Sequence, residues 1–349
     1  MRTPTRLTVA TTAAALLTTS MVGSALAQDE GGTIRISGSS TVEPISSFVA
    51  AAYSADNDVT ISVDGPGTTT GFELFCNGDT DISDASRGIK DVEVENCAAG
   101  GVDPVELKVG IDGLAVIVSQ QNDSIQCFNF NDLYAIFGIE SDPLRTWEDV
   151  SAFAAELGSE TADWPSGDIA ITAPGDESGT WGSFIEITLE DIQEARAEAG
   201  NVDPEAEPYT RQPGDLYVAS PNDNVIIDGV ANNPNGIGFV GYAFAVNNAD
   251  RVRMVPIDGG DGVCIGPDEE TVAANTYPIS RDLFIYPAVD RVDAASDSYN
   301  AAVAPFVDYY LSDEGIQNVS AAGYVQLAPE ALEETRAAWQ AAKDSVGAE

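Results

Sequence analysis

The sequence predicts an α/β protein built as two lobes, and three observations support this prediction. Strand-like and helix-like segments alternate along the chain, which is typical of α/β folds. Two apolar runs, near Ile111 and near Tyr277, indicate strands that cross between the lobes. Small and hydroxyl residues follow several strands and lead into helices. The first lobe would then contain both chain ends, and the second lobe would be inserted between them.

The predicted boundaries begin with a signal peptide over residues 1–27. Arg2 and Arg6 precede an apolar stretch that ends in Ala25-Leu26-Ala27, a small-x-small cleavage site. No cysteine lies at that site and no later apolar run could span a bilayer, so we expect a periplasmic protein without a lipid anchor. Residues 28–112 and 280–349 would form lobe 1, and residues 113–279 would form lobe 2.

The charge of the chain narrows its possible partners. The 57 acidic and 15 basic residues give a net charge of −42 at pH 7, and loss of the signal peptide would leave −44. Such acidity argues against nucleic acid and anionic membranes as partners, and it fits a salt-rich habitat. An anionic ligand would have to be held by local main-chain dipoles and one or two well-placed cations.

The chain contains no histidine. This excludes Ser-His-Asp and Cys-His catalysis in their usual forms, His-based zinc sites and a His pH switch. The sequence also has no C-x-x-C pair, no nucleophile-elbow pattern and no carboxylate cluster with obvious metal-ligand spacing. We therefore expect no catalytic residue, no metal site and no cofactor.

Four cysteines, Cys76, Cys97, Cys127 and Cys264, predict two disulfides in an exported chain. Four cysteines allow three connectivities. Cys76 and Cys97 fall in lobe 1, whereas Cys127 and Cys264 fall in lobe 2. Pairing within lobes leaves the hinge free to move, and a bridge between lobes would lock it. We therefore predict Cys76–Cys97 and Cys127–Cys264.

Two strand-to-helix turns are candidates for an anion site. Gly38-Ser39-Ser40-Thr41 precedes the helix-like residues 42–53, and residues 175–180 precede a helix-like run over about 181–197. The first N–H groups of a helix lack internal partners and, together with the helix dipole, attract anions. Two facing helix starts could hold one anion, although each turn alone is better explained as an ordinary N-cap.

Two further segments carry candidate ligand groups. Residues 64–71 form a third turn, where Thr68 offers a hydroxyl donor, although ordinary turn chemistry also explains its glycines. The short strand-like segment 80–87 ends with Asp84 and Arg87. Such pairs are common on surfaces. At the carboxyl end of a strand in an open α/β sheet, however, they lie where such folds bind ligands.

The remaining expectations concern the later part of the chain. Residues 111–119 predict a strand buried on both faces, and Trp147 is expected in a connection. Residues 251–257 and 283–286 predict strands, and the expected closing helices are 301–311, 314–322 and 329–342.

Six short motifs are spread in order over most of the mature chain. They are Gly38-Ser39-Ser40-Thr41 with Pro44, Gly67-Thr68, Ile82-Ser83-Asp84-Ala85-Ser86-Arg87, Ser178-Gly179-Thr180, Gly236-Ile237-Gly238-Phe239-Val240-Gly241-Tyr242, and Tyr277-Pro278-Ile279-Ser280-Arg281. As a set they resemble the periplasmic phosphate-binding proteins of bacterial high-affinity phosphate ABC transporters. Each motif is weak by itself.

The resemblance implies a type II-like, two-lobed periplasmic-binding-protein fold with two crossover strands as its hinge. It implies a monomeric receptor, not an enzyme, that closes on one dehydrated phosphate and delivers it to a permease and ATPase complex in the inner membrane. In the ligand set that it implies, Ser40, Thr41, Thr68, Ser178, Gly179 and Thr180 donate hydrogen bonds, and Asp84 accepts a proton from phosphate.

One departure from the family concerns the cation. Some members place an Arg a few residues before Ser-Gly-Thr, where this chain has Pro174. Arg87 lies in an Asp-Ala-Ser-Arg sequence that resembles another branch of the family, and it is the expected replacement. The charge of the ligand would then be met from the other lobe.

The sequence leaves other functions open. The same site could serve another tetrahedral oxyanion, such as sulfate or a phosphonate. A metal-dependent phosphohydrolase that uses the abundant Asp residues is a second alternative, and a signalling or adhesion protein that kept the fold is a third. Titration with phosphate and sulfate would test the first alternative, and phosphate release with and without divalent metal would test the second.

Overall fold

The computed structural model describes residues 32–160, 164–176, 178–203 and 210–346. The predicted signal peptide, residues 1–27, lies outside the described residues, as does Glu177 in the second turn.

In the described part of the chain, nine strands form one sheet in the order β2-β1-β3-β12-β4-β8-β6-β7, with β9 paired to β4. These strands are β1 (Gly32–Gly38), β2 (Val59–Asp64), β3 (Ile82–Ala85), β4 (Leu107–Ser119), β6 (Ala170–Ala173), β7 (Tyr217–Ala219), β8 (Gly236–Gly241), β9 (Val252–Met254) and β12 (Ser280–Pro287). A smaller sheet joins β11 (Cys264–Ile265), β10 (Ile257–Asp258) and β5 (Phe128–Asn129).

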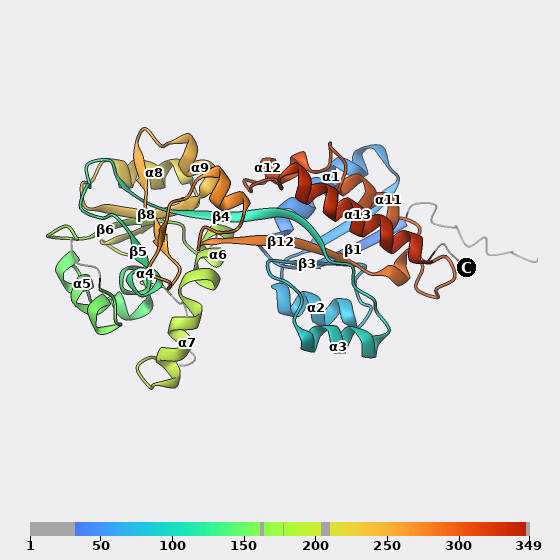
Figure 1. The fold of residues 1–349 in the computed structure, drawn as a ribbon, viewed down its shortest axis with the longest axis horizontal. Coiled ribbons are helices and arrows are strands. Elements are labelled where there is room, and N and C mark those ends of the chain that lie inside the picture. Colours follow the sequence, from blue (N-terminus) through green and yellow to red (C-terminus); the bar gives the residue numbers. More distant parts are fainter. Residues whose placement is uncertain (1–31, 161–163, 177, 204–209, 347–349) are drawn as a thin grey trace, which may run out of the picture. The chain divides into compact units, whose positions relative to one another are not determined.

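The long strand β4 connects the two parts of the large sheet (Figure 1). Residues 107–113 of β4 pair with β12, and residues 114–118 pair with β8. The other edge of β12 pairs with β3. We call the part around β1, β2 and β3 lobe 1, and the part around β6, β7 and β8 lobe 2. The buried strand predicted over residues 111–119 is confirmed, while the lobe boundaries at 112/113 and 279/280 stay a prediction.

The helices of lobe 1 cover both faces of its strands (Figure 1). They are α1 (Glu43–Asp56), α2 (Thr68–Cys76), α3 (Asp91–Gly100), α11 (Val303–Tyr310), α12 (Gln317–Ala321) and α13 (Pro329–Val346), with the 3₁₀ turn η2 (Val289–Arg291). Successive strand side chains point to opposite faces. Accordingly, Ile82 of β3 belongs to the core that α1 and α11 share, and Ala85 belongs to the core beneath α2 and α3.

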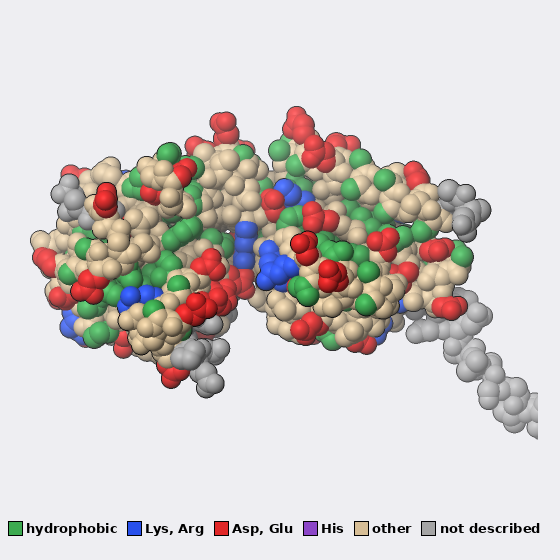
Figure 2. Space-filling model, turned by 60° about the horizontal axis from the view of Figure 1, so that its bottom comes forward, with side chains coloured by type: hydrophobic (Ala, Val, Ile, Leu, Met, Phe, Trp, Pro, Cys, Tyr) green, Lys and Arg blue, Asp and Glu red, His purple; other side chains and the backbone are tan. Residues whose placement is uncertain are grey.

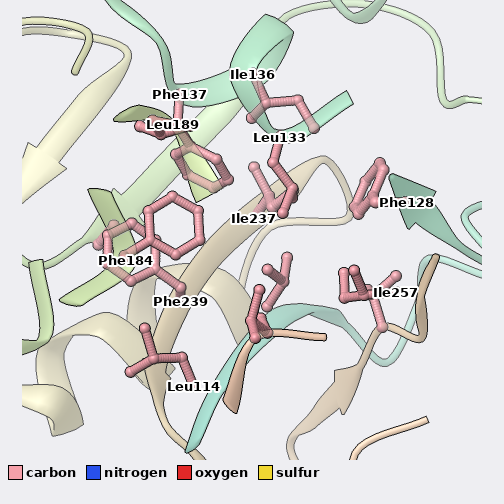
Figure 3. Close-up of a cluster of buried hydrophobic side chains, with 14 of the residues drawn as sticks. Leu114, Phe128, Leu133, Ile136, Phe137, Phe184, Leu189, Ile237, Phe239 and Ile257 are labelled. Atoms are coloured by element: carbon pink, nitrogen blue, oxygen red, sulfur yellow. The ribbon is translucent and has the colours of Figure 1, made fainter. Parts of the chain in front are cut away.

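Lobe 2 has the same layered arrangement. Its helices are α4 (Phe130–Phe137), α5 (Trp147–Glu156), α6 (Gly179–Thr188), α7 (Glu190–Glu198), α8 (Asp223–Ala231), α9 (Tyr242–Asn247) and α10 (Glu269–Ala273), with the 3₁₀ turn η1 (Ile139–Ser141). In its core, the rings of Phe184 and Phe239 stack at 3.8 Å, and the ring of Phe137 meets each edge-on (Figure 3). This stack ties α6 to β8 and α4, and so fixes the position of the α6 start.

Three sequence expectations are wrong. The single strand predicted over residues 251–257 is two short strands, β9 and β10, which lie in different sheets, and Pro256 between them has no N–H to donate. The helix predicted over residues 181–197 is two helices, because Leu189 buries its side chain in the lobe 2 core at the junction, where the Thr188 hydroxyl donates to the Phe184 carbonyl at 2.6 Å. Trp147 begins α5 instead of lying in a connection. The Thr146 hydroxyl accepts from the N–H of Asp149, whose carboxylate accepts from the N–H of Thr146, and this capping box starts the helix.

Both predicted disulfides are present. Cys76–Cys97 links α2 to α3 within lobe 1, and Cys127–Cys264 links the residue before β5 to β11 within lobe 2. Neither bridge connects one lobe to the other, so β4 and β12 carry no disulfide across the junction.

The aromatic stack gives a stability prediction. Phe184→Ala should lower the free energy of unfolding by about 3–5 kcal/mol, because the deleted ring leaves a cavity between Phe137 and Phe239. Phe48→Ala is the matched control, since Phe48 on α1 is 48% exposed and should change stability by only about 0.5 kcal/mol. Urea unfolding measures both, and equal losses would contradict this view of the core.

Candidate functional site

The two helix starts predicted to hold an anion face each other in the structure. A Cβ placed on Gly179, the first residue of α6, would lie 4.0 Å from the carbonyl oxygen of Ser40. Next to this contact, Oγ1 of Thr41 lies 3.1 Å from Oγ of Ser183. The structure therefore brings together the turns that contain Ser40, Thr41, Ser178, Gly179 and Thr180.

The third turn lies beside the first. Gly67 has φ of +106°, a conformation that favours glycine, and its N–H donates to the carbonyl of Gly38 at 2.8 Å. Thr68 then begins α2, and its Oγ1 accepts from the N–H of Ser86 at 3.2 Å. Gly38 itself must be small, because a Cβ there would lie 2.0 Å from the main-chain oxygen of Asp84. These close contacts place Thr68 between the first helix start and the end of β3.

Asp84 lies at that strand end with its side chain fully buried. Its Oδ1 accepts a hydrogen bond from the Ser46 hydroxyl at 2.9 Å. Its Oδ2 has no hydrogen-bond partner among the described residues. Burial raises the pKa of Asp84 to about 7, with a further rise from the charge of Glu43, although the Ser46 bond opposes both. This carboxyl therefore changes its charge near neutral pH and has one oxygen available for a protonated ligand.

Arg87, the cation expected from the sequence, is already paired. Its Nη1 and Nη2 donate to the two carboxylate oxygens of Glu93 at 2.8 and 2.7 Å, and Nη2 also donates to Thr69 Oγ1 at 3.1 Å. The guanidinium lies over the ring of Phe72. Arg87 thus lies at the wall of lobe 1 with its charge largely compensated by Glu93.

A second arginine, Arg281 of β12, lies between the facing helix starts. Its Nη2 donates to Thr41 Oγ1 and to Ser183 Oγ, each at 3.0 Å. Its Nη1 pairs with Glu186 of α6, and its Nε lies 3.4 Å from Asp112 Oδ2. Arg281 ends the last of the six sequence motifs, and no role in the site was predicted for it. Its position at the start of a predicted crossover strand was the signal that could have identified it.

Burial and the nearby positive charge shift the pKa of Asp112 in opposite directions. Burial raises the pKa of this carboxyl, while the charge of Arg281 and hydrogen bonds from Ser183 and Arg281 act in the opposite direction. Asp112 is almost completely buried, so Arg281 is the cation that compensates it.

Among the described residues, two cavities lined from both lobes adjoin this centre. The larger, of about 540 Å³, is lined by Thr68, Ser86, Arg87 and Lys90 of lobe 1, by Glu186 and Glu190 of lobe 2, and by Arg281. The smaller, of about 260 Å³, is lined in part by Thr180, Ser183, Asp112 and Tyr324. Figure 2 shows Lys and Arg side chains on both sides of the central hollow of this face, with Asp and Glu side chains close to them. The larger cavity accordingly has three basic side chains, Arg87, Lys90 and Arg281, and two acidic ones in its lining.

The described residues contain neither a candidate metal site nor a membrane-spanning helix. No group of three or more His, Cys, Asp or Glu side chains in that part of the chain is arranged to hold a metal ion. Within the same residues, no helix is both long and apolar enough to cross a membrane.

The chain is similar to known proteins over most of its length. The chain matches the family model of the PBP superfamily domain over residues 23–314. It is 33% identical over 304 residues to the phosphate-binding protein PstS of Staphylococcus epidermidis, with 87% of this chain and 81% of the relative covered. It is 32% identical over 311 residues to protein SphX of Synechococcus elongatus, with 87% and 82% covered. The chain therefore belongs to the PBP superfamily and, within it, to the family of PstS phosphate-binding proteins.

Solved structures support the same conclusion. The crystal structure of a possible phosphate-binding protein from Planctomyces limnophilus matches with a TM-score of 0.75 and 30% identity, covering 89% of this chain and 99% of that chain. PstS from Borrelia burgdorferi matches with a TM-score of 0.57 and 22% identity, covering 85% and 99%, and this likeness concerns the fold alone. The predicted two-lobed α/β fold and the predicted family are confirmed.

The burial of Asp84 gives a pH prediction for the ligand-free protein. Its folded pKa of about 7 lies above the ordinary value of 3.8, so the folded state binds more protons between these limits. The contribution of Asp84 to stability is therefore fully present below pH 3.8 and is lost as the pH rises through 7. Asparagine cannot ionise, so Asp84→Asn removes this loss. From pH 5 to pH 8, the free energy of unfolding of the variant should rise by on the order of 2–4 kcal/mol relative to that of the parent.

Urea unfolding of the stripped parent and of Asp84→Asn at both pH values measures this gain. Asp282→Asn is the control, because Asp282 is paired with Lys108 in a partly exposed ion pair on β12. A difference between parent and Asp84→Asn that stays constant with pH would contradict the assignment.

Proposed function

We propose that this protein is an exported receptor that binds inorganic phosphate between its two lobes and delivers it to an ABC-type phosphate permease. The observation that carries the proposal is the pair of facing helix starts with Arg281 between them. Main-chain N–H groups at helix starts, helix dipoles and a forked guanidinium together suit a tetrahedral oxyanion. The relatives named as phosphate-binding proteins support phosphate as that anion.

The proposal assigns each ligand contact to a structural element. Ser40 and Thr41 donate from the start of α1, Thr68 donates from the start of α2, and Ser178, Gly179 and Thr180 donate from the start of α6. Asp84 accepts the proton that phosphate carries, because its free Oδ2 can accept a hydrogen bond and, when ionised, cannot give one.

We assign the charge of phosphate to two arginines, Arg87 and Arg281. Each already has a carboxylate partner, so phosphate must replace part of that pairing. Glu186 is the partner that is most easily displaced from Arg281, since its side chain is 46% exposed and can return to water. Asp112 cannot leave in this way because it is buried.

The proposal includes the organisation of the chain in the cell. Residues 1–27 are the signal peptide, residues 28–112 and 280–349 form lobe 1, and residues 113–279 form lobe 2. The lobes close about β4 and β12 as a monomer in the periplasm, where the closed form meets the permease and ATPase complex of the inner membrane. The two disulfides, each within one lobe, support an exported protein that moves at this hinge.

Titration of the ligand-stripped protein tests the ligand. Phosphate should bind, and at pH 8 it should bind at least about 10-fold tighter than sulfate, because the Asp84 carboxyl, with its pKa of about 7, is then largely ionised and sulfate would leave its acceptor unpaired. Calorimetry measures both affinities. Trp181, which follows Thr180 on α6, offers a fluorescence signal for the same titration. A parent protein that binds neither anion, or binds sulfate as tightly, would overturn the proposal.

Substitution of the two arginines tests the charge assignment. Arg281→Gln should weaken phosphate binding by about 100-fold and Arg87→Gln by about 10-fold, the range expected for loss of one charged hydrogen-bonding group. The larger effect falls on Arg281 because it contacts Thr41 before α1 and Ser183 of α6, the two helices whose starts face each other. Arg145→Gln is the control, since Arg145 is an exposed arginine paired with Asp215. Unchanged affinity in Arg281→Gln would remove that residue from the site.

A further inference from the structure

Two buried hydroxyl groups, those of Tyr310 and Ser46, connect the core of lobe 1 to Asp84 by hydrogen bonds, and we call them the relay. The Ser46 hydroxyl, on α1, donates to Asp84 Oδ1 at 2.9 Å, and Oη of Tyr310, on α11, lies 3.2 Å from Ser46 Oγ. All three side chains are completely buried. A hydroxyl has a single proton to donate. Because Ser46 gives its proton to Asp84, the proton between Tyr310 and Ser46 must come from Tyr310.

The relay is the main polar contact of the Asp84 side chain. From α1 it is faced by Ser46 and by the charge of Glu43, and from α11 by Tyr310. The strand neighbours that pair with it are Gly38 on β1 and Ile285 on β12, and neither can titrate. In the described part of the chain, Ser46 is the one side-chain donor recorded for the carboxylate, and Oδ2 has no partner.

We propose that Ser46 and Tyr310 are positioning residues of the ligand site, which occupy Oδ1 of Asp84 from within lobe 1 and leave Oδ2 to accept a proton from the ligand. This inference rests on the proposed function. The two residues contact Asp84 or each other and act on the ligand only through it.

The relay affects whether Asp84 or the bound anion holds the proton between them. A hydrogen bond to an ionised carboxylate favours the ionised form, so the relay keeps Asp84 an acceptor despite its burial. Without the Ser46 hydroxyl, the buried carboxyl takes up a proton at higher pH. A carboxyl that holds its own proton can donate it to sulfate, which brings none. Loss of the relay should therefore reduce the ratio of phosphate affinity to sulfate affinity.

Four variants test the proposal in the full-length mature protein. Ser46→Ala and Tyr310→Phe each remove one hydroxyl of the relay. Ser47→Ala and Tyr309→Phe are matched controls at the neighbouring positions of α1 and α11; Ser47 is exposed, and Tyr309 packs its ring against Tyr53. Thermal unfolding of each variant reports whether it folds like the parent.

The first measurement is the titration midpoint of the Asp84 carboxyl in the ligand-free protein, followed by ¹³C NMR with labelled aspartate and assigned by the signal that Asp84→Asn removes. Ser46→Ala should raise the midpoint by about one pH unit and Tyr310→Phe by roughly half as much, because Tyr310 acts through Ser46. The controls should leave it unchanged. A merely structural role for Ser46 would not move this midpoint.

The second measurement is the ratio of phosphate to sulfate affinity at pH 8, measured by calorimetry with the two inorganic anions. The ratio should fall about tenfold or more in Ser46→Ala and stay at the parent value in Ser47→Ala and Tyr309→Phe. If Ser46→Ala does not fold, Tyr310→Phe decides the question by the same two criteria, since it removes only one oxygen atom.

The outcomes separate this inference from the proposed function. A parent protein that binds no phosphate overturns the proposed function. A parent that binds phosphate, together with relay variants that keep both the Asp84 midpoint and the affinity ratio, overturns the relay alone.

Discussion

The antiparallel pairing of β4 with β12 is the interaction on which the site depends. Its register sets Arg281 directly opposite Asp112, so the ion pair between them follows from the strand alignment. From that position the guanidinium reaches Thr41 before α1 and Ser183 within α6. One arginine on a central strand thus contacts both α6 and the turn that leads into α1. The same two strands join the lobes, so the proposed hinge and the proposed ligand site both include residues of β4 and β12.

The charge of the chain limits how it can hold an anion. At a net charge of −42, the field of the whole protein opposes phosphate, and capture must be local. The structure concentrates local donors by bringing three helix starts together and by placing Arg87, Lys90 and Arg281 around one cavity. It also supplies Asp84, whose burial places its charge change near neutral pH. In the proposed site, selectivity depends on one acceptor among many donors, and the hydroxyls of Tyr310 and Ser46 are proposed to orient that acceptor.

Part of the fold was visible in local patterns. The continuous apolar run of β4 predicted a buried strand, because such a run suits a strand covered on both faces. The start of α5 was equally local, since Thr146 and Asp149 form a capping box, but the sequence analysis did not use this signal. The division of the predicted helix into α6 and α7 was not local, because the side chain of Leu189 turns into a core made by other elements.

The sequence by itself determined the α/β alternation and the hydroxyl-rich turns that supply N–H donors, because these depend on neighbouring residues. It also predicted the disulfide pairing, because each cysteine pair was assigned to one lobe. Only the tertiary structure decided which charged groups share the site. Arg281 is 240 positions from Thr41 in the chain, and Tyr310 is 264 positions from Ser46. Their contacts depend on strand register and helix packing, which place residues together regardless of their separation. Arg87 shows the converse. Its motif predicted a cation for the ligand, whereas in the fold its guanidinium pairs with Glu93.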